Sequence, residues 1–266
     1  MNVAVKVFYI GTKYHGSQMQ PGLRTIEGEL QKAVNKYNAE NYGKVKFSGR
    51  TDKGVHSLGQ IVVLPIKGEM FYPEKLNTEL PEDIIVWAWT KVPPNFNPRR
   101  DVNSRTYRYF YPTWNVSLDF EKMRIAANEF IGEHNFSHFA KPRNDQNPVT
   151  IIHNLEIFQN NTYIEFKIRG RNFLWMMVRK IIRALIQVGS NELNIETLRD
   201  IINLKSKPQK GFQPVPANGL ILWDIETKFN FTINKKGIKR IKQLVNSYIF
   251  NLEQGLNIMK KINDFM

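Results

Sequence analysis

The sequence predicts an α+β fold with mainly antiparallel sheets flanked by helices. Segments typical of strands occur at residues 3–9, 61–66, 84–89 and 104–111, where apolar side chains alternate with polar ones or form short runs. Helical segments lie between them, but strands and helices do not alternate strictly. This grouping favours antiparallel pairing over the repeated parallel units of an α/β fold.

The first helix is predicted to start at residue 26, directly after Thr25, a residue suited to capping a helix. Five apolar residues recur at helical spacing and share one face: Ile26, Leu30, Ala33, Val34 and Tyr37. Phe47 marks a further short strand, and Pro73 is expected to open a short helix.

A second helix is expected over residues 120–131, ending at Gly132. Two strands, 151–158 and 163–168, flank the pair Asn160-Asn161. Asparagine tolerates left-handed backbone geometry, so this pair predicts a hairpin turn.

The last part of the chain is predicted to contain helices at 173–188 and 195–204 and a strand at 220–225. The tail from residue 235 is basic and amphipathic. Its apolar residues share one helical face: Ile238, Ile241, Val245, Ile249 and Leu252.

A stretch at 141–148 is rich in proline, asparagine and charge, which is typical of a linker. It predicts two halves of ordinary size, 1–140 and 149–266. The N-terminal half would carry the aspartate loop described below, and the C-terminal half would carry an arginine-bearing helix and the basic helical tail.

The composition is basic, with a formal net charge of +14 and a sequence pI near 9.8, which suits a polyanionic partner. A lysine-rich surface that serves only solubility is the alternative. The absence of cysteine excludes disulfides, thiolate metal sites and cysteine nucleophiles. We find neither a signal peptide nor an apolar run long enough to span a membrane, so we expect a cytoplasmic protein.

The most informative segment is residues 49–60, Gly-Arg-Thr-Asp-Lys-Gly-Val-His-Ser-Leu-Gly-Gln. Apolar residues before and after it predict two strands, so Asp52 is expected to be displayed on the loop between them. The alternative is an ordinary hairpin in which Gly54 takes a positive φ and Asp52 bonds its own backbone.

This segment resembles the signature of the TruA family of tRNA pseudouridine synthases. Further segments match the same family in the same order, so the resemblance covers most of residues 3–227: Gly11 to Gln18, Thr25 to Leu30, Arg105 to Tyr109, Gly132 to Phe136, Phe173 to Arg179 and Gly219 to Leu222.

The resemblance implies two similar α+β halves with a basic active-site cleft between them. It implies that Asp52 is the catalytic residue and that Arg179 pairs with it through the forked guanidinium, which favours the charged carboxylate. Tyr107 would stack on the target base and assist removal of the C5 proton. Leu222, with Leu220 as the less favoured candidate, would form the opposite wall of the uracil pocket, and Arg50 would enter the RNA stem when the base is flipped out.

The resemblance implies uridines 38, 39 and 40 of the tRNA anticodon stem-loop as targets, and a homodimer. The sequence has no glycine-rich nucleotide-binding motif, so we expect no cofactor. Two alternatives remain open: a related enzyme acting at other tRNA positions, and a non-catalytic tRNA-binding protein. We expect no metal, because His134 and His138 lack a third ligand and the usual zinc-binding pattern.

Overall fold

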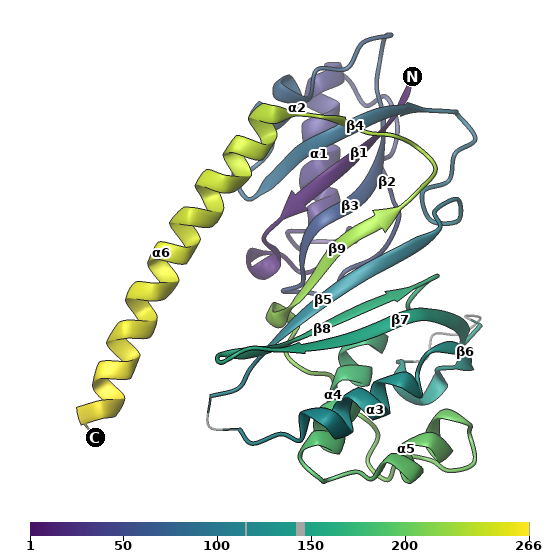
Figure 1. Ribbon diagram of the computed structural model, residues 1–266. Coiled ribbons are helices and arrows are strands. Elements are labelled where there is room, and N and C mark those ends of the chain that lie inside the picture. The colour runs from purple at the N-terminus through teal and green to yellow at the C-terminus, as the bar shows by residue number, and fades with distance from the viewer. Residues whose placement is uncertain (115, 142–146, 266) are drawn as a thin grey trace.

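The computed structural model describes residues 1–114, 116–141 and 147–265, which form ten strands and six α-helices (Figure 1). Nine strands lie in one continuous sheet in the order β10-β4-β1-β3-β9-β5-β8-β7-β6, and β2 pairs with β3 beside that path. The strands are β1 (Asn2–Tyr9), β2 (Lys46–Phe47), β3 (His56–Pro65), β4 (Ile84–Val92), β5 (Ser104–Pro112), β6 (Gly132–Asn135), β7 (Val149–Gln159), β8 (Tyr163–Gly170), β9 (Leu220–Glu226) and β10 (Thr232–Ile233).

Among these described strands, β3 and β9 are parallel and the other pairs are antiparallel. The predicted α+β class and the mainly antiparallel pairing are therefore confirmed. The strands of both predicted halves are joined in one sheet, because β9 is inserted between β3 and β5.

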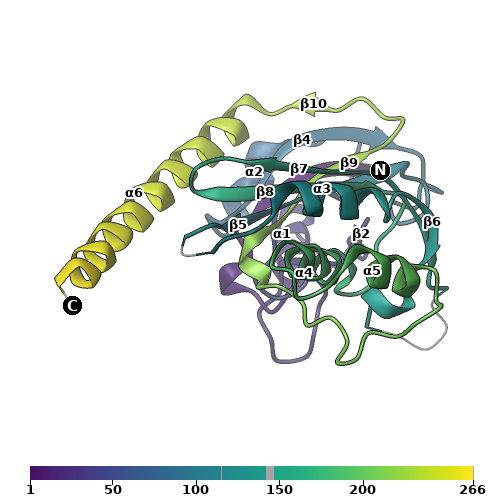
Figure 2. The ribbon, with the colours of Figure 1, turned by 60° about the horizontal axis from the view of Figure 1, so that its bottom comes forward.

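Helices α1, α4 and α5 lie on the same side of this sheet (Figure 2). The six helices are α1 (Ile26–Asn38), α2 (Pro73–Glu79), α3 (Phe120–Asn128), α4 (Met177–Gly189), α5 (Ile195–Ile202) and α6 (Lys235–Phe265). Three short 3-10 helices cover Gly11–Lys13, Ser137–Phe139 and Ala217–Gly219. Within the described parts of the chain, no helix is both long and apolar enough to cross a membrane.

Helix α1 begins as predicted, because the Thr25 hydroxyl accepts a hydrogen bond from the Gly28 N–H at 3.2 Å. All five residues of its predicted apolar face are buried. They pack against β1, β3 and β4 in a core that also includes Val5, Leu64 and Val86. A second core, on β5, β7 and β8, packs against α3, α4 and α5.

The predicted hairpin between β7 and β8 is present, but the expectation that an asparagine of its turn adopts a left-handed backbone conformation is wrong. Asn160 and Asn161 are absent from the described non-glycine residues with positive φ. Instead, the Asn160 side-chain oxygen accepts hydrogen bonds from the Thr162 and Tyr163 N–H groups, each at 2.9 Å. The asparagine therefore stabilises the turn through its side chain.

The predicted linker at 141–148 includes residues 142–146, which lie outside the described part of the chain. The division into halves 1–140 and 149–266 therefore stays a prediction. The described residues show that strand β5 and helix α3 of the first half share a core with α4 of the second.

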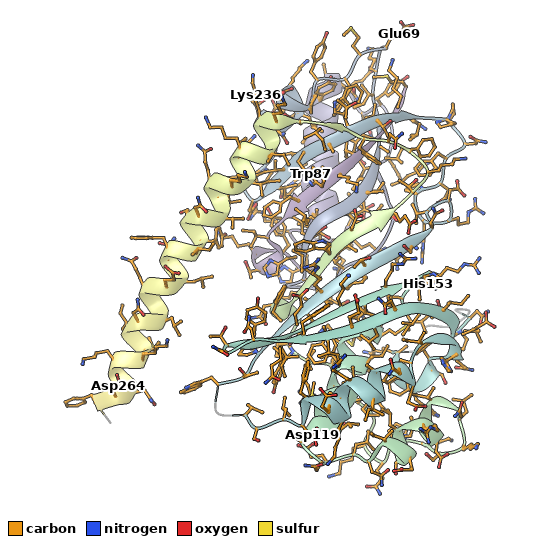
Figure 3. The ribbon with its side chains drawn as sticks, viewed as in Figure 1. Glu69, Trp87, Asp119, His153, Lys236 and Asp264 are labelled. Carbon is orange, nitrogen blue, oxygen red and sulfur yellow. The ribbon has the colours of Figure 1, made fainter. Side chains whose placement is uncertain are left out.

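Helix α6 confirms the helix predicted from residue 235, and it runs away from the sheet along much of its length (Figures 1 and 3). Its first turns are anchored by Ile241, which packs against Phe8 and Ile85. Lys236 lies near the anchored end and Asp264 near the free end (Figure 3). Apolar side chains such as Leu252 in the far part are exposed.

Candidate active site

The site lies where the parallel pair β3–β9 meets β5. Leu222 of β9 is opposite Ser57 of β3 on one side and Tyr107 of β5 on the other. The loop that carries Asp52 runs into the start of β3 at His56. Tyr107 and Leu222 are far apart in the sequence, but the strand pairing brings them together at the base of the aspartate loop.

The backbone directly before Asp52 is fixed by hydrogen bonds to Ser17 and Tyr9, near the start of the chain. Thr51 donates its N–H to Ser17 Oγ at 2.8 Å, and its carbonyl accepts the Ser17 N–H at 3.0 Å. The Thr51 hydroxyl shares a further hydrogen bond of 2.8 Å with the Tyr9 hydroxyl. Thr51 and Ser17 are both buried, so these bonds are shielded from water.

Residues on both sides of Asp52 stabilise the rest of the loop. The Gln60 amide donates to the Gly49 carbonyl at 2.9 Å and accepts the Gly49 N–H at 3.3 Å. Gly54 has a φ of +87°, in the left-handed region that favours glycine, and the Val55 N–H donates to the Asp52 carbonyl at 3.1 Å. The turn chemistry predicted for Gly54 is thus present.

Asp52 forms an ion pair with Arg179 of α4. Arg179 Nη1 lies 2.9 Å from Asp52 Oδ2, and their side chains are 12% and 24% exposed respectively. The expected forked contact is wrong, because Arg179 Nε donates to the Val215 carbonyl at 2.7 Å instead of to Asp52. One guanidinium therefore joins the carboxylate to the segment that follows α5.

Tyr107 is buried and its ring meets Phe173 edge-on, with centroids 5.3 Å apart. Burial raises the pKa of Tyr107 above its ordinary value of 10.0, with smaller effects in the same direction from Tyr9 and Asp52. The phenol therefore keeps its proton at neutral pH. It is suited to donating a hydrogen bond or relaying a proton, but a protonated phenol cannot itself act as a general base.

The two remaining predicted residues differ in exposure. Leu222 is fully buried, and Leu220, the less favoured candidate for the same wall, is 5% exposed. Arg50 is exposed on the loop, two residues before Asp52. Of the five predicted site residues, Asp52 and Arg179 are in direct contact, Tyr107 is paired with Leu222, and Arg50 is exposed on the loop that carries Asp52.

Sequence reasoning missed two residues of this site. The Trp175 indole N–H donates to Asp52 Oδ1 at 3.0 Å. Arg105 is buried and donates to the carbonyls of Ser48, Arg99 and Arg171 at 2.7–3.0 Å. The sequence gives no local signal of the partners of Trp175 or of the Arg105 contacts with Ser48 and Arg171, because these bonds join segments far apart in the chain.

The helix that supplies Arg179 also starts later than expected. The apolar run predicts a helix from residue 173, but α4 begins at Met177, because Met176 adopts a left-handed conformation with φ 63°. Residues 173–176 therefore form a turn outside the helix, and Trp175 lies on this turn.

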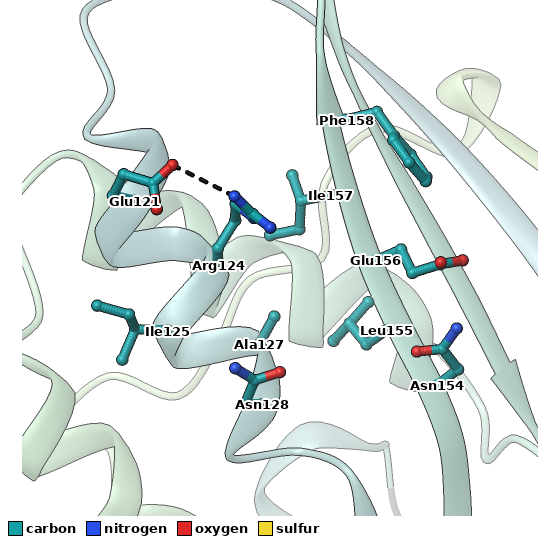
Figure 4. Close-up of a pocket in the computed structure, with 10 residues that line it drawn as sticks. All are labelled: Glu121, Arg124, Ile125, Ala127, Asn128, Asn154, Leu155, Glu156, Ile157 and Phe158. Carbon is teal, nitrogen blue, oxygen red and sulfur yellow. Dashed lines mark hydrogen bonds and ion pairs between the residues drawn. The ribbon is translucent and has the colours of Figure 1, made fainter.

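A cavity away from this site lies between α3 and β7 (Figure 4). It has a volume of about 420 Å³ and is open and polar, with Arg124, Glu121 and Asn154 among its lining residues. None of the five predicted site residues lines it. In the described residues, no group of three His, Asp or Glu side chains is placed to hold a metal ion.

Comparison with known proteins shows the family of this chain. A family model described as tRNA pseudouridine synthase matches residues 6–99 and 126–228. The chain belongs to this family. Its members are isomerases that convert uridine in tRNA to pseudouridine, so the chain is an enzyme of that class.

Curated relatives cover almost the whole chain. The tRNA pseudouridine synthase A of Archaeoglobus fulgidus is 38% identical over 94% of this chain and 92% of its own. The tRNA pseudouridine synthase A of Methanosphaera stadtmanae is 40% identical, and the match covers 85% of this chain and 84% of the relative's chain. A chain from the archaeal box H/ACA sRNP Nop10-Cbf5 complex is 14% identical with a TM-score of 0.34, and the match covers 70% of this chain and about half, 54%, of that one. A structural likeness this weak carries no argument.

Proposed function

We propose that this enzyme isomerises uridines 38, 39 and 40 of the tRNA anticodon stem-loop, with Asp52 as its catalytic carboxylate. The observation that carries the proposal is the ion pair between Asp52 and Arg179 on a partly exposed loop.

The reaction breaks the bond between ribose C1′ and uracil N1 and forms a bond between C1′ and C5. The C5 proton leaves and N1 gains a proton, so atoms and electrons balance without a cofactor. A carboxylate meets the requirement either as the nucleophile that attacks the ribose or base, or as the base that removes a ribose proton. Arg179 holds the carboxylate in place for either role, with its Nη1 2.9 Å from Asp52 Oδ2.

Three further residues fit the substrate side of this proposal. Tyr107 and Leu222 are partners in the pairing of β5 with β9 and would line the uracil pocket. Exposed Arg50 would occupy the space left in the stem when the uridine is flipped out, because a base that stays stacked in the stem cannot reach the Asp52 carboxylate.

The net charge of +14 supports a basic cleft that follows the phosphates of tRNA. The family resemblance supports a homodimer, and the tRNA substrate supports a cytoplasmic location. Sedimentation of the pure protein with and without tRNA would test the dimer.

The test of the proposed function is to incubate the pure protein with an unmodified tRNA transcript and map pseudouridine by primer extension after carbodiimide labelling. We expect stops at positions 38, 39 and 40. Stops at other positions would show a different target specificity, and no pseudouridine at all would overturn the proposal.

A further inference from the structure

Both oxygens of the Asp52 carboxylate accept a hydrogen bond from a different side chain. Arg179 Nη1 donates to Oδ2 at 2.9 Å, and Trp175 Nε1 donates to Oδ1 at 3.0 Å. A single contact would leave the carboxylate free to rotate about its Cβ–Cγ bond. Two donors from two residues fix the plane of the carboxylate as well as its position.

The backbone around Trp175 is arranged so that these two donors meet. Met176 has a φ of 63°, a conformation that non-glycine residues adopt at a cost in stability. This residue separates the turn at 173–176 from α4, which starts at Met177. Arg179 then points to the carboxylate from the first helical turn, and Trp175 does so from the turn before it.

Lys141 holds the indole from its other side. The Lys141 ammonium lies 4.6 Å from the centre of the Trp175 ring. The backbone N–H of Lys141 donates to the Trp175 carbonyl at 3.0 Å. A cation over the face of an indole ring is attracted to its π electrons. The ring is thus restrained by contacts to its face, its backbone and its N–H.

From this geometry we propose that Trp175 is a positioning residue for Asp52, fixing the orientation of the carboxylate without neutralising its charge. This inference rests on the proposed function, in which Asp52 reacts. A neutral donor suits the role, because a second cation at Oδ1 would weaken the nucleophilicity or basicity that the reaction requires.

The sharpest test replaces Trp175 by benzothienylalanine, introduced by nonsense suppression. This side chain keeps the size and shape of tryptophan but has sulfur in place of the indole N–H. We expect the single-turnover rate constant to fall on the order of 10-fold or more, since hydrogen bonds to charged groups are the stronger ones. The dissociation constant for tRNA should stay within about 2-fold.

Tryptophan introduced by the same suppression should restore the full rate. Trp87→Phe is the matched control, because it removes an indole N–H that donates to the Leu58 carbonyl at 2.6 Å, a contact that does not involve Asp52. It should leave the rate unchanged. Trp175→Phe should match the benzothienyl variant if the lost donor is the cause.

Several outcomes would overturn the inference. One is an unchanged rate in the benzothienyl variant together with a loss in Trp175→Phe, which would show that the ring packs but does not position. Another is a change confined to tRNA affinity, which would make Trp175 an RNA contact. If the unaltered protein makes no pseudouridine, the proposed function itself fails, and that result is distinguishable from either of these.

Discussion

The hydroxyl groups of Tyr9 and Thr51 share a buried hydrogen bond of 2.8 Å, which joins β1 to the residue directly before Asp52. Burial raises the pKa of Tyr9 to about 12, so its hydroxyl keeps its proton at neutral pH. Through this bond, the first strand of the chain helps to position the carboxylate.

Tyr9→Phe should therefore reduce both stability and activity. Losing the hydroxyl leaves Thr51 Oγ1 without this partner, which should cost about 1 kcal/mol in the free energy of unfolding. The single-turnover rate should also fall, because the aspartate loop is held less firmly. Tyr37→Phe removes a hydroxyl that accepts the Tyr72 N–H at 3.0 Å, and should lower stability alone. Equal rates in the two variants would contradict the positioning role of Tyr9.

Gly11 allows the N-terminal segment to pass close to the aspartate loop. A Cβ atom at this position would lie 2.0 Å from the Val55 carbonyl oxygen, so Gly11→Ala must displace backbone. We expect a loss of about 1–3 kcal/mol in the free energy of unfolding and a strong loss of activity. Gly255→Ala, where a Cβ meets nothing within 4 Å, should stabilise α6 by about 0.5–1 kcal/mol and leave activity unchanged. Urea unfolding and turnover assays would check both.

His56 should make stability depend on pH. Its Nδ1 accepts the Gly11 N–H at 3.3 Å, so its proton lies on Nε2, 3.2 Å from the Asn218 carbonyl. Burial lowers the pKa of His56 below its ordinary 6.5. Below pH 6.5 the unfolded chain binds a proton that the folded protein does not, so the free energy of unfolding should fall as the pH drops from 6.5 through the folded pKa.

Urea unfolding at about pH 7.5 and at lower pH would measure this loss. His56→Gln should lose less stability on acidification than the unaltered protein, since glutamine does not titrate. His153→Gln is the control, because His153 is exposed on β7 (Figure 3). An identical pH dependence in the His56 variant and the unaltered protein would rule out His56 as the source.

Arg50→Ala should act on the RNA and not on the carboxylate. If Arg50 fills the stem during base flipping, its loss should slow reaction on a paired anticodon stem far more than on a short unpaired oligonucleotide. Lys32→Ala removes another exposed cation, on α1, and should slow the reaction on neither substrate more than on the other. Single-turnover rates of Arg50→Ala on both substrates test this role. An equal loss of rate on both would refute the assignment of Arg50 to base flipping.

Local sequence signals predicted the elements whose causes are local. The Thr25 cap and apolar spacing of α1, Pro73 at the start of α2 and the hairpin between β7 and β8 are confirmed. The predicted start of α4 at residue 173 was wrong, because nothing in an apolar run distinguishes the left-handed Met176 from a helical methionine.

Long-range partners could not be predicted from residue patterns. The parallel pairing of β3 with β9, and the contacts of Trp175 and Arg105, join segments far apart in the chain. The contact between Arg179 and Asp52 was expected only through the family resemblance, since an arginine on a helix is more often an exposed surface charge. Short β6 was missed because its four residues carry no strand pattern.

The central claim is that Asp52 is the reacting carboxylate, and Asp52→Asn tests it most directly. The change removes the charge and keeps the shape, while Asp224→Asn does the same to a carboxylate paired with Lys6 outside the site. The measurement is single-turnover pseudouridine formation alongside the tRNA dissociation constant. We expect Asp52→Asn to form no pseudouridine and bind tRNA within a few-fold of normal, and Asp224→Asn to stay active. Full turnover by a cleanly purified Asp52→Asn protein would contradict the account.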